Sequence, residues 1–91
     1  MIILPLLFLK DGFTHTQLVR RGEFAIYHRK KGNQQAAHYE VVQIKSHNGY
    51  TLGNNEIKAA EVYPSATNWG THGWTYPTEA DAYKKLDQLT K

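Results

Sequence analysis

Two stretches in the middle of the chain alternate with the period of two that a half-buried β-strand requires. In the first stretch, residues 24–29, one face carries Phe24, Ile26 and His28. The other face carries Ala25, Tyr27 and Arg29. The second stretch, residues 39–45, carries apolar side chains on both faces, which is typical of a central strand. The polar residues 30–37 between them predict an antiparallel pair.

Shorter signals predict the rest of the sheet. A polar stretch leads into a short strand over residues 18–21, and residues 74–76 form either a short final strand or an extended lead-in to the helix. Asn48-Gly49 predicts a tight hairpin, because a type I′ turn needs positive φ at both central positions. Residues 53–55 mark another reversal, after which residues 57–63 form a third strand.

The helix signal lies near the C-terminus, just after Pro77. Thr78 can cap a helix, and Glu79 and Asp81 lie where the helix dipole favours negative charge. One apolar stripe follows at spacings of three and four, formed by Ala82, Tyr83, Leu86 and Leu89. We therefore expect one α+β domain over residues 1–91, with an antiparallel sheet of three to five strands (24–76) and one C-terminal amphipathic helix (78–90) packed on one face.

Residues 1–11 form an apolar N-terminal strand or arm that is interrupted by Pro5. The run is too short for a spanning helix, which needs roughly 20 apolar residues, and it lacks the features of a signal peptide. We therefore expect no membrane contact. Pro5 lacks an N–H and so favours an edge strand. The alternative is an apolar arm that packs either on its own sheet or on a second copy of the chain. If the edge strand is uncovered, a symmetric homodimer is the simplest way to hide its apolar side chains.

Few residues suggest catalysis or metal binding. The chain has no cysteine, and its five histidines are scattered without the i, i+4 spacing of a helical metal site. His28 and His38 could meet across the predicted hairpin as an ordinary cross-strand pair. No phosphate-binding glycine motif is present. We expect no catalytic residue, no metal and no cofactor, and a reducing compartment such as the cytoplasm.

The positive charge is concentrated in the first half of the chain. Seven Lys or Arg against three Asp or Glu give +4 in residues 1–45, and four against five give −1 in the remainder. We expect Tyr27 and Tyr39 to lie on the outward face between these basic groups, and cationic groups interleaved with tyrosines are typical of nucleic-acid surfaces. The candidate residues are Arg20, Arg21, Tyr27, Arg29, Lys30, Lys31, Tyr39 and Lys45. The alternative is that basic hairpin ends only prevent aggregation of sheet edges.

Both tryptophans lie in the glycine-rich residues 68–76. Such a cluster either wraps the core at the start of the helix or offers an exposed aromatic group to a protein partner. We expect Trp74 to pack beneath the helix, and Trp69 with His72 to form a candidate protein-binding loop.

Residues 73–83, which run from Gly-Trp-Thr-Tyr-Pro-Thr into the helix after three strands, resemble the strand-to-helix junction of AP2-type and phage-integrase-type DNA-binding domains. That resemblance implies a sheet that reads DNA and is backed by one helix. The chain lacks the outward Arg and Trp of those strands. Residues 40–42, 62–65 and 69–76 also resemble small proteins encoded by phages and mobile elements, which implies a location in the cytoplasm of a bacterial host.

Two functions follow as hypotheses. The first is a small non-enzymatic, phage-type module that binds nucleic acid through the basic sheet surface. The alternative is a protein-binding inhibitor or modulator of a host complex, for example a defence or nucleic-acid-processing complex.

Overall fold

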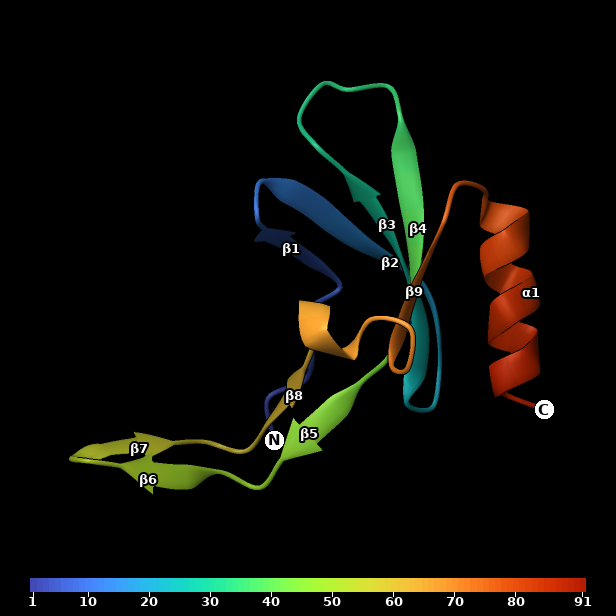
Figure 1. Ribbon diagram of the computed structural model, residues 1–91. Helices are drawn as coiled ribbons and strands as arrows, with labels where there is room; N and C mark the ends of the chain where they lie inside the picture. The colour runs from blue at the N-terminus through green and yellow to red at the C-terminus, as the bar shows by residue number, and fades with distance from the viewer.

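The computed structural model describes all 91 residues and has an α+β architecture (Figure 1). A five-stranded antiparallel sheet has the order β1-β2-β3-β4-β9, and one C-terminal helix, α1 (Glu79–Leu89), packs against it. The strands are β1 (Leu7–Lys10), β2 (Phe13–Arg21), β3 (Phe24–Lys30), β4 (Ala37–Gln43) and β9 (Gly73–Tyr76). The expected fold class is confirmed, with β4 in the interior of the sheet between β3 and β9.

Helix α1 begins where the capping signal places it. The Thr78 hydroxyl accepts a hydrogen bond from the Asp81 N–H at 3.2 Å, which satisfies one of the free donors of the first turn. The buried side chains of α1 pack on the strands in one cluster, formed by Ile26, Val41, Ala82 and Leu86. Trp74 also packs against this cluster, as predicted.

A second cluster covers the opposite face of the sheet. It contains Leu4, Ala25, Tyr27, Val42 and Ile44, and Phe8, Tyr63 and Trp69 pack against it. The predicted alternation in β3 is confirmed, but the prediction that Tyr27 faces outwards is wrong. Tyr27 is fully buried because the N-terminal segment and the connection between β8 and β9 cover this face.

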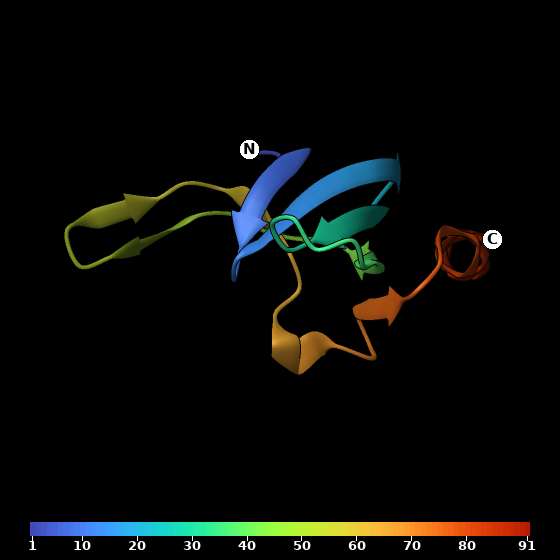
Figure 2. The ribbon, with the colours of Figure 1, turned by 90° about the horizontal axis from the view of Figure 1, so that it is seen from above.

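Residues 45–62 leave the sheet as a projecting hairpin (Figures 1 and 2). From here on, the arm means this hairpin and not the N-terminal residues 1–11. Its base pairs β5 (Lys45–His47) with β8 (Ala60–Val62), and its outer part pairs β6 (Tyr50–Leu52) with β7 (Asn55–Ile57). The predicted reversal at 53–55 is confirmed as the tip. The predicted hairpin at Asn48-Gly49 is wrong, because these residues connect β5 to β6 along one limb, and the predicted third strand is divided between β7 and β8.

The β1–β2 hairpin was not expected from the sequence. Asp11 and Gly12 both have positive φ, 54° and 81°, which matches the twist of a two-residue hairpin. The polar residues 14–17 belong to the nine-residue strand β2, because β1 pairs with this part of β2. Within it, the His15 side chain is buried.

The N-terminal residues form an edge strand, as expected. Ile2 bridges Ala60 at the base of the arm, Leu4 is buried, and β1 then forms one edge of the main sheet. Six apolar side chains of this segment remain more than half exposed, namely Met1, Ile2, Ile3, Leu6, Leu7 and Leu9. Helix α1, with 11 residues, is too short and too polar to cross a membrane.

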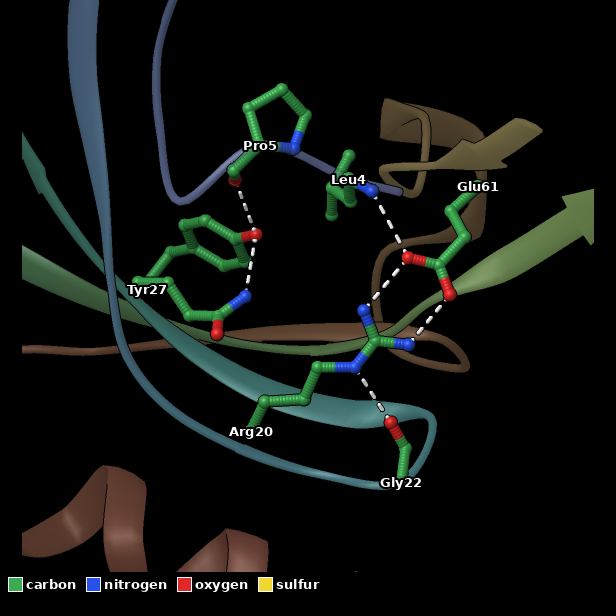
Figure 3. Close-up of polar contacts among 7 residues, drawn as sticks. Leu4, Pro5, Arg20, Gly22, Tyr27 and Glu61 are labelled. Carbon is green, nitrogen blue, oxygen red and sulfur yellow. Dashed lines mark hydrogen bonds and ion pairs between the residues drawn. The ribbon is translucent and has the colours of Figure 1, made fainter. Parts of the chain in front are cut away.

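The Glu61 carboxylate ties the base of the arm to the N-terminal segment and to β2 (Figure 3). It accepts two hydrogen bonds from the Arg20 guanidinium, at 2.7 and 2.6 Å, and one from the Leu4 N–H at 3.0 Å. The Arg20 bonds, followed by the Leu4 N–H, lower the pKa of Glu61 to about 2. Nearby, the Tyr27 hydroxyl donates to the Pro5 carbonyl and accepts from Gln17.

This arrangement predicts acid sensitivity. The pKa of Glu61 is lower in the folded than in the unfolded protein, so its contribution to stability is full above about pH 5 and declines as the pH falls towards 2. Glu61→Gln should lower the free energy of unfolding at pH 7 by about 2 kcal/mol and reduce the loss on acidification. Urea denaturation at pH 7 and pH 3 tests this, with exposed Glu56→Gln as the control. Equal acid losses in wild type and Glu61→Gln would contradict it.

Candidate functional site

A cleft of about 310 Å³ lies on the sheet face that is turned away from the helix. Its floor comes from β2, β3, β4 and β9, and its walls come from the β1–β2 turn and from the connection between β8 and β9. The polar and aromatic lining residues are Lys10, Asp11, Phe13, His15, Arg29, Glu40, Tyr63, Trp69 and Thr75.

Glu40 is a buried carboxylate on the floor of the cleft, with 5% of its surface exposed. Its Oε1 atom accepts a hydrogen bond from the Tyr63 hydroxyl at 2.5 Å and lies 3.5 Å from His15 Nε2. His15 Nδ1 lies 2.9 Å from the Phe13 carbonyl oxygen, which can only accept, so Nδ1 carries a proton. Strands β2 and β4 and the β8–β9 connection are therefore joined through one buried polar network.

This network leaves little freedom for acid–base chemistry. Both ring nitrogens of His15 face a protein acceptor, and Phe8 stacks on the ring at 4.8 Å. Burial, and then the neighbouring Glu40 carboxylate, raise the pKa of Tyr63 far above its usual range. In this geometry no group of the network is placed as a free base or nucleophile.

Arg29 is the group in the cleft with unused hydrogen-bonding capacity. Its guanidinium lies over the Phe13 ring at 4.3 Å, and Nη1 is 3.6 Å from Glu40 Oε2, beyond a strong hydrogen bond. The Nε atom is buried with no hydrogen-bond partner. The guanidinium is thus held by stacking and by charge, while its donors lack good acceptors.

Two lysines stand beside the aromatic groups of the same cleft. Lys10 Nζ lies 5.3 Å from the centre of the Tyr63 ring, and Lys31 Nζ lies 5.6 Å from that of Phe13. With Arg29 they place three positive charges around a concavity that the carboxylates of Asp11 and Glu40 also line.

Trp69 forms a wall of the cleft and is not an exposed loop residue. Its ring lies over Gly73, where an added Cβ would come within 2.5 Å of the ring, and its Nε1–H donates to the Thr75 hydroxyl at 2.9 Å. Trp69 also packs against the core cluster around Tyr27. The expectation that Trp69 is exposed is therefore wrong, and the neighbouring His72 is half-buried, with its ring bonded to Thr71.

The structure does not bring most of the predicted basic residues together on one surface. Arg20 pairs with Glu61, and Arg21 pairs with Asp87 of α1. Tyr27 is buried, and Tyr39 packs against the helix-side cluster. The remaining lysines outside the cleft lie apart, with Lys30 on the helix-side face of β3 and Lys45 at the base of the arm. Of the predicted residues, Arg29 lines the cleft and Lys31 stands beside Phe13.

The proposed histidine pair is not formed. His28 lies opposite Tyr39, whereas His38 lies opposite Arg29, so the two histidines occupy neighbouring positions on opposite faces of the sheet. No three His, Asp or Glu side chains come together as a metal site.

Sequence reasoning missed the residues of the buried polar network, His15, Glu40 and Tyr63, and it also missed Lys10, Phe13 and Thr75. The sequence did contain a signal for Glu40, because this charged residue lies on the same strand face as the apolar Val42 and Ile44. His15 and Tyr63 carried none, since their proximity depends on long-range pairing.

Comparisons with known protein families, curated proteins and solved structures find no match for this chain. The resemblance to AP2-type and integrase-type domains stays a prediction, and the face that it concerns is the sheet face away from the helix. In this structure Leu4, Tyr63 and Trp69 cover that face, and the cleft is the concavity that remains on it.

Proposed function

We propose that this protein is a non-enzymatic binding module that contacts single-stranded nucleic acid by holding one nucleotide unit in the cleft. The observation that carries the proposal is Arg29, a guanidinium that stacks on Phe13, lines the cleft and has its Nη1 3.6 Å from Glu40 Oε2, beyond a strong hydrogen bond. Arginine in this setting suits phosphate, because its planar fork binds anionic oxygens in pairs.

The other groups of the cleft fit the same ligand. Lys10 and Lys31 add charge that attracts the phosphate, while Trp69 supplies a planar apolar wall against which a base can stack. The cleft volume of about 310 Å³ is at the lower end of small-molecule sites. It therefore suits one nucleotide with its base unpaired rather than a duplex.

Glu40 supports this site without touching the ligand. Its Oε1 atom is engaged by Tyr63 and His15, and its Oε2 faces Arg29. The carboxylate therefore holds the guanidinium in place from below. Part of the positive charge of Arg29 is offset by Glu40, so Lys10 and Lys31 must supply the net attraction for an anion.

Fluorescence anisotropy with a labelled single-stranded DNA or RNA of about ten nucleotides tests the proposal. Because Glu40 offsets the charge of Arg29, Lys10 and Lys31 predict a slope of log K against log salt of about −1.4, since each phosphate contact in a single strand contributes roughly −0.7. Lys10→Gln combined with Lys31→Gln should weaken binding at least tenfold at low salt. Lys45→Gln combined with Lys58→Gln removes the same charge from exposed positions of the arm and should change binding less than twofold.

Two results would overturn the proposal. One is no binding of any single strand at low salt. The other is an equal loss in both double variants, which would show that net charge rather than the cleft determines affinity.

A further inference from the structure

The outer edge of β1 is unpaired and apolar. β1 pairs with β2 on one side and has no strand on the other. The exposed side chains of residues 1–9, called here the apolar strip, are Met1, Ile2, Ile3, Leu6, Leu7 and Leu9, with exposed fractions of 56–74%. Proteins usually blunt such edges with charge, and this one carries leucines.

The register of β1 shows which backbone groups are free. The Gln17 N–H bonds to the Leu6 carbonyl, and Phe8 and Lys10 lie opposite His15 and Phe13. Hydrogen-bonded pairs alternate along an antiparallel ladder, so the N–H and C=O groups of Leu7 and Leu9 point away from β2. Two outward donors and two outward acceptors therefore lie along one apolar edge.

We propose that this edge binds a second copy of the same chain, with the two β1 strands antiparallel about a two-fold axis at Phe8. In this register Leu7 of one copy lies opposite Leu9 of the other, twice. Each outward N–H then meets an outward C=O, which is the condition for four new backbone hydrogen bonds. This proposal is independent of the proposed function, because the backbone pairing that it requires does not depend on ligand binding by Arg29, Lys10 or Lys31.

The charges near the edge fit this occupant. Lys10 of one copy falls beside Leu6 of the other, and Asp11 falls beside Pro5, so no like charges meet. The strip carries no charged side chain with which to select a charged partner. A self-complementary apolar edge of this kind is what a two-fold interface requires.

The symmetry has a consequence for the cleft. Antiparallel pairing of two identical edges places the two-fold axis perpendicular to the sheet and produces one continuous sheet of ten strands. Both clefts then lie on the same face. A dimer would therefore present two nucleotide sites on one side, able to engage one strand together if the spacing allows.

Sedimentation equilibrium of the full chain tests the dimer. Strand β1 has only four residues, so the paired edge is short and we expect a dissociation constant in the micromolar range. The wild-type mass should rise from 10.4 kDa towards twice that value with concentration. Leu9→Lys should remain at the mass of one chain, whereas Leu52→Lys, at a similarly exposed position on the arm, should behave as wild type.

Cross-linking tests the register, since the chain has no cysteine of its own. A mixture of Leu7→Cys and Leu9→Cys proteins should form a disulfide between the two variants more readily than either protein alone. A wild-type chain that stays a monomer at several hundred micromolar would overturn the proposal. So would dissociation by Leu52→Lys alone, or preferential cross-linking within one variant.

Discussion

Glu40→Ala is expected to lower the free energy of unfolding by about 3 kcal/mol, the cost of removing a buried carboxylate that accepts from Tyr63 and faces His15. The variant leaves Arg29 without its counter-charge and leaves the Tyr63 hydroxyl without its acceptor. Small domains have total stabilities of about 5–15 kcal/mol, so this change approaches global unfolding.

Urea denaturation measures the effect, and Tyr63→Phe is its matched control. That variant deletes one hydroxyl from the same network, keeps every charge, and should cost about 1–2 kcal/mol. A loss below 1 kcal/mol for Glu40→Ala would mean that the carboxylate does not organise the cleft.

Tyr27→Ala is expected to cost about 3–5 kcal/mol, as for other large aromatic side chains removed from a core. Tyr27 is fully buried, and its hydroxyl joins Pro5 to Gln17. Its loss would leave a cavity beneath the N-terminal segment and remove two hydrogen bonds.

Thermal and urea unfolding test this prediction, with Tyr50→Ala as the control. Tyr50 is 54% exposed on the arm, and its removal should cost less than about 1 kcal/mol. If Tyr27→Ala reduced only nucleic-acid binding and left stability unchanged, Tyr27 would be the outward stacking residue that the sequence pattern suggests, and the buried position would be wrong.

The parts of the fold that could be predicted are those encoded locally. The alternation in residues 24–29, the cap at Thr78 and the apolar stripe of α1 each depend on neighbouring residues, and all three are confirmed. The arm was missed because Asn48-Gly49 is a strong turn signal whose flanking residues pair differently. Pairing of β5 with β8 is a long-range choice that no local pattern contains.

The candidate site could be predicted only in part, for a related reason. Period-two alternation identified the two faces of β3 but not which face is covered. Both faces are covered, so Tyr27 became core while Arg29, two residues further on, reached the cleft. The sequence predicts that Arg20 and Arg21 are free surface charges. Their partners, Glu61 and Asp87, lie 41 and 66 residues further along the chain, so no local pattern indicates the two ion pairs.

A titration of the ¹⁵N-labelled full chain with a short oligothymidylate, followed by NMR, tests the central claim most directly. The two tryptophans provide an internal comparison, because Trp69 lines the cleft and Trp74 packs on the helix side of the sheet. Binding in the cleft predicts a saturable shift of the Trp69 indole N–H and of Arg29 Nε–H, with Trp74 unchanged. An unchanged Trp69, or equal shifts of both indoles, would contradict it.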